Sequence, residues 1–497
     1  MIDTVADLPR CGRPREVAIR RRGPGGAART YGELDERTSR AANGLLGKGL
    51  KRGDRLAAWM DDGIAYVELY LAAAKAGLVI VPINARFLGE EAGHILRDSG
   101  ARALAFSAPQ AERVDQLGVD VITLDEPALE GLLDQGDPRP PAPPARDDLY
   151  ILGYTSGTTG PPKGAMLTHR SVLAIARLNA ISYRLPIGSV AALTGSMSFV
   201  ATVPAHILTH LYVGGRSVIM GRWDVQSLLH TIAAERITFT YLPSPTIPDF
   251  TEAARGADLH ALRSVLHSAS RAEPDKLRAL CEVIGDRFVE GWGMTENSGG
   301  LMTATRAGDG ERTFTTVGRA AVETAIVALG PDGETLEPGQ VGELAFRSPA
   351  LMDGYWSHPS TSTPDRRGGP LQGWFHSGDL GALDEDGFVT IADRRTDLIV
   401  SGGMNVYPSE VEDCIAALAG VRECAVVGLP HERWGQTVVA VVVGEVAAEA
   451  VVEHCRERLA SYKKPTSVVF LDALPRTTSG KVRRGAVRDL VKQTAVW

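Results

Sequence analysis

Residues 154–169 combine glycine, hydroxyl and lysine side chains in a way that suits a polyphosphate. The segment reads Tyr-Thr-Ser-Gly-Thr-Thr-Gly-Pro-Pro-Lys-Gly-Ala-Met-Leu-Thr-His and follows an apolar run, residues 149–152, that predicts a buried strand. Glycines let backbone N–H groups turn toward one point, and the hydroxyls and Lys163 beside them favour an anion there. We therefore predict an anion-binding loop. An ordinary surface turn rich in Gly and Thr is the alternative.

The segment does not fit the phosphate loop of P-loop kinases. That loop needs a lysine that is followed by Ser or Thr and leads into a helix. Here Lys163 is followed by Gly164, and Pro161 and Pro162 before it oppose the start of a helix. A P-loop kinase is therefore excluded.

Residues 291–296, Gly-Trp-Gly-Met-Thr-Glu, place an aromatic ring and a carboxylate on one loop after a predicted strand. The ring of Trp292 could stack on a base, and the carboxylate of Glu296 could hold Mg²⁺ against phosphate. A buried tryptophan and a surface glutamate are the alternative for this segment alone.

Three later segments carry polar residues beside glycine. Asp379 ends the run Gly-Trp-Phe-His-Ser-Gly-Asp and could bind two ribose hydroxyls. Residues 393–408 contain Gly402 and Gly403, and residues 475–481 end in Lys481. Each of these segments, taken singly, is also compatible with an ordinary surface loop.

Composition limits the class of protein. A chain of 497 residues is too long for one core and predicts two to four structural units. A net charge of -7 argues against a nucleic-acid partner, which would need a basic surface. Five cysteines without CxxC spacing indicate neither zinc nor disulfides, as expected in the cytoplasm.

No targeting or membrane segment is expected. The N-terminal arginines are interrupted by acidic residues and no apolar stretch of a signal peptide follows them, so we interpret them as a solvated edge. The longest apolar run, residues 71–83, contains Lys75 and Gly77 and is too short to span a bilayer. We therefore predict no membrane partner.

The first third of the chain alternates short apolar strands with amphipathic or apolar helices, which predicts a mostly parallel, helix-covered sheet. A proline-rich stretch, residues 137–148, is interpreted as an exposed connection within one large domain. Strands are predicted at 16–19, 54–59, 78–81, 103–106, 237–241, 262–266 and 287–289, and helices at 30–46, 64–76, 88–99 and 170–179.

The order and spacing of these segments resemble the adenylate-forming (ANL) superfamily, which comprises acyl-CoA synthetases, stand-alone adenylation enzymes and beetle luciferases. The resemblance runs from about Thr30 to about Arg488. It implies a mixed α/β fold with a large N-terminal multi-sheet domain, residues 1–393, and a small mobile α+β domain, residues 394–497. The active site of such enzymes lies between the two domains.

The resemblance also implies roles for individual residues. Lys481 would be the catalytic lysine of the first half-reaction, and Thr295 and Glu296 would hold phosphate and Mg²⁺. Trp292 stands where the family usually has tyrosine beside adenine. The residues expected to bind ATP and AMP are Thr155, Ser156, Gly157, Thr158, Thr159, Gly160, Lys163, Ala269, Ser270, Gly291, Trp292, Gly293, Asp379 and Arg394.

The resemblance further implies that the small domain rotates between two half-reactions. The usual hinge residue is Asp or Lys, whereas Thr396 occupies the matching position here. Gly402 and Gly403 would line the channel for the pantetheine of coenzyme A, where a side chain would obstruct the thiol.

The acid pocket is expected near Phe199 and Val200, the latter replacing the family's histidine. No aspartate stands there to pair with an amino group, so we expect a hydrophobic or bulky carboxylic acid; the alternative is that both residues belong to the core.

The leading hypothesis is an acyl-CoA synthetase that uses ATP, Mg²⁺ and coenzyme A and acts as a monomer or homodimer. A carrier-protein-loading enzyme, a non-catalytic nucleotide-binding protein and a light-emitting oxygenase stay open as alternatives.

Overall fold

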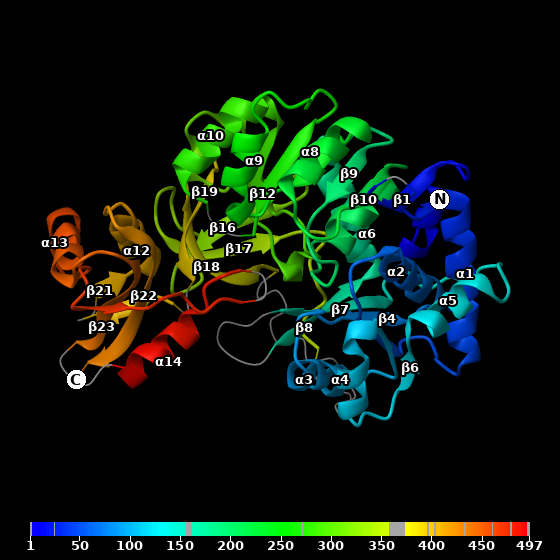
Figure 1. The fold of residues 1–497 in the computed structure, drawn as a ribbon. Coiled ribbons are helices and arrows are strands. Elements are labelled where there is room, and N and C mark those ends of the chain that lie inside the picture. The colour runs from blue at the N-terminus through cyan, green and yellow to red at the C-terminus, as the bar shows by residue number, and fades with distance from the viewer. Residues whose placement is uncertain are drawn as a thin grey trace. The chain divides into compact units, whose positions relative to one another are not determined.

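The computed structural model describes residues 2–23, 25–155, 162–269, 272–356, 373–394, 397–401, 404–431, 434–459, 461–477 and 480–494. The chain divides into two compact units (Figure 1). The first contains the described residues of Met1–Thr155, Pro162–Ala325 and Phe346–Phe375, and the second those of Ile326–Ala345 and His376–Trp497. The predicted domain boundary after residue 393 stays a prediction, because this division groups residues 376–393 with the C-terminal part.

A six-stranded sheet is built from strands in the N-terminal part of the first unit. Its strand order is β6-β5-β3-β4-β7-β8, and every pairing is parallel except that of β7 with β8. The predicted parallel, helix-covered arrangement is confirmed. The strands are β3 (Arg55–Trp59), β4 (Val79–Pro82), β5 (Ala103–Phe106), β6 (Ile122–Leu124), β7 (Leu149–Thr155) and β8 (Lys163–Thr168).

Local sequence explains where the first helices begin and how deeply they are buried. Helix α1 (Tyr31–Gly47) begins directly after Thr30, near the predicted start, because the Thr30 hydroxyl accepts the N–H of Glu33 and the Glu33 carboxylate accepts the N–H of Thr30. Helix α2 (Ile64–Ala76) has the predicted bounds and is apolar on all sides, as suits a helix inside the core. Shorter helices α3 (Gly89–Ser99), α4 (Ala111–Gln116) and α5 (Glu126–Asp134) complete this region.

A nine-stranded sheet forms the rest of the first unit, in the order β15-β14-β13-β12-β11-β9-β10-β1-β2. Pairing is parallel from β13 to β1 and antiparallel at both ends. The strands are β1 (Val17–Arg21), β2 (Ala28–Thr30), β9 (Val190–Leu193), β10 (Arg216–Ile219), β11 (Phe239–Tyr241), β12 (Ser264–Ser268), β13 (Phe288–Gly291), β14 (Thr303–Arg306) and β15 (Arg319–Ala320).

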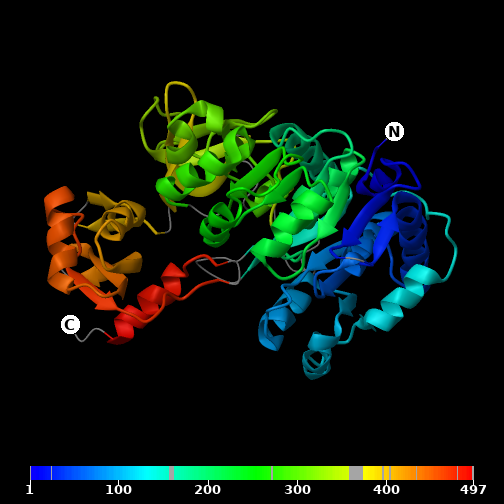
Figure 2. The ribbon, with the colours of Figure 1, turned by 45° about the horizontal axis from the view of Figure 1, so that its top comes forward.

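Helices cover this sheet (Figure 1 and Figure 2). Apolar residues of the helices and of the sheet are buried together. Leu228, Phe250 and Leu277, one from each of three helices, pack in one core cluster with strand residues such as Val265 and Phe288. Phe239 stacks instead on Tyr183, with ring centroids 4.9 Å apart. The helices are α6 (His169–Ser182), α7 (Leu208–Tyr212), α8 (Val225–Ala234), α9 (Ile247–Ala253), α10 (Pro274–Ile284) and α11 (Arg312–Thr315), with a π-helical turn η3 (Val203–Ile207).

Two further sheets lie mostly in the second unit. One has the order β16-β17-β18-β19, and the other has β21-β20-β23-β22 with β24 paired to β23. The strands are β16 (Ala325–Leu329), β17 (Gly342–Arg347), β18 (Phe375–Leu383), β19 (Val389–Arg394), β20 (Ile399–Ser401), β21 (Met404–Val406), β22 (Val421–His431), β23 (Gly435–Gly444) and β24 (Ser467–Phe470).

Both faces of the β22–β23 hairpin are buried, which explains its unbroken valine runs. Val438 and Val442 pack with Val411 of α12 (Pro408–Ala416) and with Val451 of α13 (Ala448–Arg458). The alternate residues of β23 pack with Val487 of α14 (Arg484–Thr494). One strand therefore serves two small cores.

The proline-rich stretch is a connection within the first unit, as predicted. The Asn43 side chain donates to the carbonyls of Asp137 and Arg139 at 2.9 and 2.8 Å, and Arg52 donates to the carbonyl of Pro143 at 2.9 Å. Within the described part of the chain, every helix is either too short or too polar to cross a membrane.

Candidate active site

The predicted anion-binding loop joins the antiparallel strands β7 and β8. Thr155 and Lys163 face each other at the end of this hairpin, and the Thr155 hydroxyl donates to the Lys163 carbonyl at 3.5 Å. Ser156, Gly157, Thr158, Thr159 and Gly160, between them, lie outside the described residues. Lys163, which we expected on the loop, is instead the first residue of β8 and is exposed.

A tyrosine that sequence reasoning missed connects this hairpin to Glu296. Gly354 accepts the N–H of Met166 at 3.0 Å, and Trp356 donates to the Gly164 carbonyl at 2.7 Å, so residues 353–356 lie along β8. Tyr355 between them donates its hydroxyl to Glu296 Oε1 at 2.5 Å.

The Tyr355 ring also faces a cation, because Lys163 Nζ lies 5.4 Å from its centroid. We call Lys163, Tyr355 and Glu296 the Tyr355 network. An aromatic pair directly after Gly354 was the only sequence signal for it.

The turn around Glu296 is held on several sides. Thr295, Glu296 and Asn297 form a 3₁₀ turn η6 (Thr295–Asn297). The Met352 N–H donates to the Glu296 carbonyl at 2.8 Å, and the Ser298 hydroxyl donates to the Ala350 carbonyl at 2.8 Å. Glu296 is only 7% exposed. Its carboxylate therefore has a fixed position in the first unit.

Thr295 packs against the expected acid-binding segment through Gly153. A Cβ on Gly153 would lie 2.7 Å from Val200 Cγ2 and 3.1 Å from Thr295 Cγ2. Val200 is buried in this contact, whereas Phe199 is half-buried. The strand before the anion loop, the Thr295 turn and Val200 are thus brought together. A role of Phe199 and Val200 in binding an acid stays a prediction.

The glycines on either side of Trp292 have a packing reason. A Cβ on Gly291 would lie 2.5 Å from the Thr303 carbonyl oxygen, and one on Gly293 would lie 2.5 Å from that of Gly300. Both glycines therefore let two backbone segments pass closely. The Trp292 ring is buried and meets Phe346 edge to face, with centroids 6.4 Å apart. The expected contacts of Gly291, Trp292 and Gly293 with a nucleotide stay predictions.

Two residues expected at the ribose face each other in the second unit. Asp379 of β18 and Arg394 of β19 are direct partners in the antiparallel register. Asp379 is buried, and its N–H donates to the Ser377 hydroxyl at 3.0 Å. Sequence reasoning assigned both residues to one sugar without knowing that these strands pair. Their role at the ribose stays a prediction.

Lys481 is exposed at the end of a short turn in the second unit. The Thr477 N–H donates to the Lys481 carbonyl at 2.7 Å, and the Lys481 N–H donates to the Thr477 hydroxyl at 3.1 Å. Two expected features of this unit, the hinge residue Thr396 and the channel glycines Gly402 and Gly403, lie outside the described residues, as does Ser270 of the first unit.

Arg484, which sequence reasoning also missed, holds three carboxylates beside the expected hinge. Its guanidinium lies 2.5 Å from Glu412, 3.4 Å from Asp397 and 3.8 Å from Asp393. Burial raises the pKa of the Asp397 carboxyl, and the nearby Arg484 charge opposes that rise.

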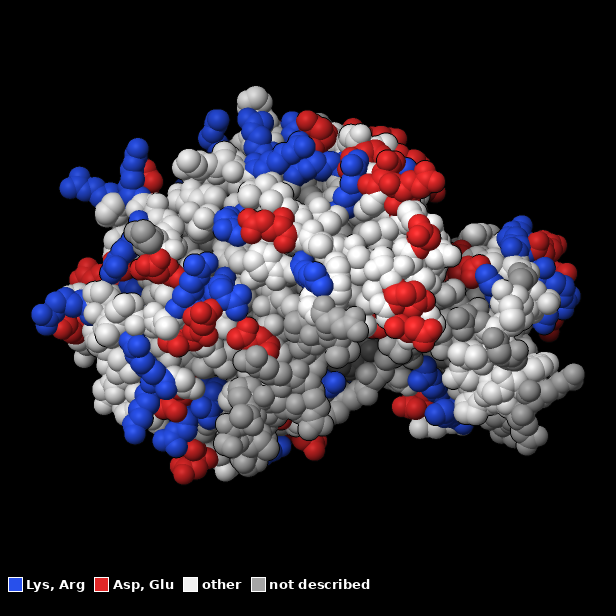
Figure 3. Space-filling view, turned by 180° about the vertical axis from the view of Figure 1, so that it is seen from behind, with Lys and Arg blue, Asp and Glu red and all other residues white. Residues whose placement is uncertain are grey.

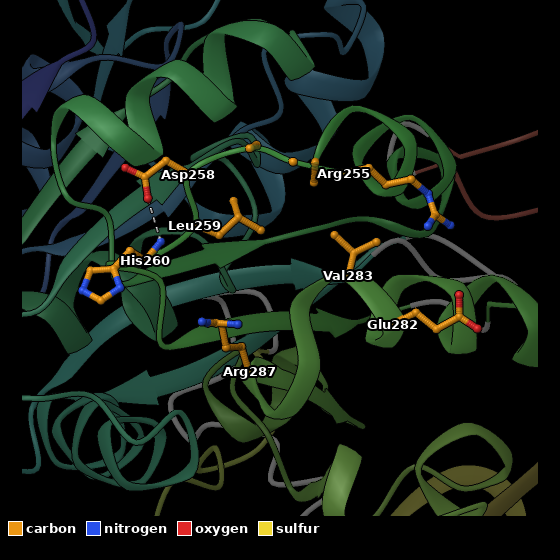
Figure 4. Close-up of a pocket in the computed structure, with 10 residues that line it drawn as sticks. Arg255, Asp258, Leu259, His260, Glu282, Val283 and Arg287 are labelled. Atoms are coloured by element: carbon orange, nitrogen blue, oxygen red, sulfur yellow. Dashed lines mark hydrogen bonds between the residues drawn. The ribbon is translucent and has the colours of Figure 1, made fainter.

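An open hollow of about 560 Å³ lies away from these residues, at residues 254–260, 282–283 and 287 (Figure 4). These residues precede β12 and β13, so the hollow is at the amino ends of the strands, whereas Ala269 and Trp292 follow the carboxyl ends. Ligands of parallel sheets bind at the carboxyl ends. Arg287 already donates to the carbonyls of Leu262 and Ile284.

On one face of the molecule, the charge of the described residues is mixed rather than concentrated (Figure 3). Figure 3 shows one face, on which Lys and Arg side chains are interspersed with Asp and Glu among the residues described. No continuous basic patch covers the described residues of that face.

Comparisons with known proteins identify the family. The model of the AMP-binding enzyme family matches residues 11–356, and that of the AMP-binding enzyme C-terminal domain matches residues 410–481. The chain is 37% identical to a feruloyl-CoA synthase of Amycolatopsis sp over 96% of both chains. It is 33% identical to the long-chain-fatty-acid–CoA ligase FadD13 of Mycobacterium tuberculosis over 94% of this chain and 93% of that protein.

A solved structure agrees with this result. ATP-bound MatB from Rhodopseudomonas palustris superimposes with a TM-score of 0.89 at 28% identity and covers 98% of this chain and 99% of its own. The predicted fold class and the predicted reaction class, an AMP-forming acyl-CoA synthetase, are confirmed. The chain belongs to the AMP-binding enzyme family, within the adenylate-forming superfamily.

Proposed function

We propose that this enzyme activates an aromatic or other bulky hydrophobic carboxylic acid with ATP and transfers the acyl group to coenzyme A. The observation that carries the proposal is the Tyr355 network, which places a cation and a buried carboxylate beside the predicted anion loop. The similarity to a feruloyl-CoA synthase supports an aryl acid. A half-buried Phe199 supports an apolar pocket, although Asp62, which sequence reasoning missed, accepts the N–H of Met197 in the same segment at 2.7 Å.

In the first step a carboxylate oxygen of the acid attacks the α-phosphorus of ATP and pyrophosphate leaves. The step is slow without help because an anion approaches a triphosphate and the leaving group carries still more charge. Lys163, beside the loop, would offset charge on the phosphates, and Lys481 would bridge the attacking carboxylate and the α-phosphate.

The Glu296 side chain fits a magnesium site. Magnesium usually takes one or two protein carboxylates and completes its shell with water and substrate phosphates. Glu296 offers one carboxylate, and the described residues contain no cluster of three or more acidic, His or Cys ligands that would indicate an all-protein cage. When bound, the ion would neutralise phosphate charge. Tyr355 would orient Glu296 by holding one of its two oxygens.

In the second step the thiol of coenzyme A attacks the acyl carbon, the bond from that carbon to the AMP oxygen breaks, and AMP leaves. We propose that residues 394–497 rotate between the steps about Thr396, and that Gly402 and Gly403 line the thiol channel.

Asp379 and Arg394 would bind the ribose, and Trp292 with Ala269 and Ser270 would flank the adenine. The cross-strand register of Asp379 and Arg394 supports the first assignment. The free state of all five cysteines supports a reducing, cytoplasmic location. The partners that we propose for this enzyme are small molecules, namely the carboxylic acid, ATP and coenzyme A.

The proposal is tested by pyrophosphate release from the purified protein over aliphatic, aryl and polycyclic acids, each with and without coenzyme A. We expect release with one acid class and acyl-CoA only when the thiol is present. Release that never yields acyl-CoA would favour the second candidate, an enzyme that loads a separate carrier protein. Absence of release with every acid would contradict both.

A further inference from the structure

Ala269 holds a backbone conformation that alanine rarely adopts. It directly follows β12, and its φ is +72°, in the left-handed region that disfavours residues with a Cβ. Five described residues other than glycine have positive φ, and two of them, Ala269 and Ser298, lie in or beside segments expected to bind the nucleotide. Such strain persists only where the surrounding structure fixes the backbone.

Neighbouring strands supply that fixation. The Tyr241 hydroxyl of β11 donates to the Ser268 carbonyl at 3.3 Å. His267 is fully buried, and its Nε2 lies 2.8 Å from the hydroxyl of Ser244. Its Nδ1 pairs with Oε2 of Glu290, the residue opposite it on β13. We call Ser244, His267 and Glu290 the strand-end bridge, because they join the carboxyl ends of β11, β12 and β13.

The strand-end bridge has the order of a hydrolytic triad, but the backbone directly after Ser244 does not supply the donors that bind an oxyanion in such triads. Pro245, next to Ser244, has no N–H. The Thr246 N–H donates to the Pro243 carbonyl at 2.9 Å. Neither of the two positions after Ser244 therefore offers a donor to a tetrahedral intermediate. A structural role explains the three residues better than a nucleophilic one.

Burial makes the bridge resistant to displacement. Glu290 is buried, and burial raises the pKa of its carboxyl while His267 opposes that rise. A buried acid that loses its partner is strongly destabilised, so His267 and Glu290 hold each other in place. Ala269 follows His267 by two residues, and Trp292 follows Glu290 by two residues. The bridge therefore sets the spacing between these two expected adenine contacts.

We propose that His267 is a positioning residue for ATP, because it fixes the Ala269 turn relative to Trp292 through Ser244 and Glu290. The inference rests on the proposed function, which takes ATP as the substrate. Misplacing a binding group by about 1 Å can cost roughly 100-fold in an enzyme reaction. The effect should fall on nucleotide affinity and spare the affinity for the acid.

The test compares His267→Leu, His267→Asn and His267→Gln. Leucine removes both bonds, asparagine can keep the one to Glu290, and glutamine can keep the one to Ser244. The matched control is His210→Gln, since His210 is also fully buried in the first unit but bonds the His206 carbonyl one turn earlier. Titration calorimetry with ATP and MgCl₂ reports affinity without any acid, and thermal melting reports stability.

We expect ATP affinity to fall about 10-fold or more in His267→Leu and by less in the two polar variants, with His210→Gln within about 2-fold of wild type. If the leucine variant does not fold, the polar variants give the same readout. Unchanged ATP affinity in folded His267 variants would overturn the inference, and so would an equal loss in the His210 control. Failure of the wild-type protein to bind ATP would instead contradict the proposed function itself.

Discussion

Glu296 and Lys481, the two groups proposed to act on the phosphates, are held in opposite ways. Glu296 is buried, its carbonyl accepts from Met352 and its carboxylate accepts from Tyr355. Lys481 is exposed on a short turn that its backbone closes with Thr477. The contrast indicates a preorganised binding group in the first unit and a lysine on an element that a domain rotation could carry.

The largest effect is expected from Lys481→Ala. Adenylation should fall about 10²- to 10³-fold because the bridging charge in the transition state is lost, with an unchanged melting temperature since the side chain is exposed. Thiol transfer from supplied acyl-AMP should survive. Lys492→Ala, at an exposed position of α14, is the control and should leave both steps intact. An equal loss of adenylation and thiol transfer in Lys481→Ala would contradict the assignment of Lys481 to the adenylation step.

Glu296→Gln should reduce adenylation by about 10²-fold, because the amide keeps the shape and the bond from Tyr355 but not the charge that faces the metal. The dependence of the rate on MgCl₂ concentration should shift to higher values. Glu282→Gln, an exposed position at the open hollow, is the control. A rate and magnesium dependence equal to those of the control would contradict the assignment of Glu296.

Gly153→Ala tests how tightly the fixed region is packed. The new Cβ would lie 2.7 Å from Val200, which should lower the free energy of unfolding by about 1–3 kcal/mol. Gly131→Ala in α5 adds the same atom in open space and should be neutral or stabilise by up to about 1 kcal/mol. Denaturant titration compares the two, and equal stabilities would show that the packing beside Thr295 is loose.

The smallest effect is expected from Tyr355→Phe, which removes one hydrogen bond to a charged group. Such a bond contributes about 1.5 kcal/mol, so adenylation should fall roughly 10-fold with little change in stability. Tyr31→Phe removes a buried hydroxyl that donates to the Gly215 carbonyl at 2.6 Å. That control should lower the melting temperature and leave the rate unchanged. A lower melting temperature with an unchanged adenylation rate in Tyr355→Phe would mean that Tyr355 supports the fold and does not orient the Glu296 carboxylate.

Sequence reasoning succeeded where the local pattern decides the structure. Helix α2 and strand β5 have the predicted bounds, because β5 is a continuous apolar run and α2 is apolar apart from Glu68 and Lys75. Thr30, at the start of the helix predicted at residues 30–46, caps α1, and the structure adds Glu33 as its partner in a capping box. The motif residues were located by their resemblance to a family, and the comparisons confirm that family.

What sequence reasoning missed depends on contacts between distant segments. Tyr355 reaches Glu296 only because residues 353–356 lie along β8, almost 190 residues earlier in the chain. The packing of Gly291 against the carbonyl of Thr303 on the next strand was also missed, and its predicted role at the nucleotide stays a prediction. Sequence reasoning also missed the pairing of Lys163 with Thr155, which makes Lys163 the first residue of β8, while its role toward an anion stays a prediction. A single sequence carries no signal for such pairings.

The most direct test of the account is acid-dependent exchange of labelled pyrophosphate into ATP, measured without coenzyme A. Because the adenylate forms before the thiol is needed, the account predicts exchange with the cognate acid alone and its loss in Lys481→Ala. Exchange that requires coenzyme A, or consumption of ATP that yields ADP instead of AMP, would contradict it.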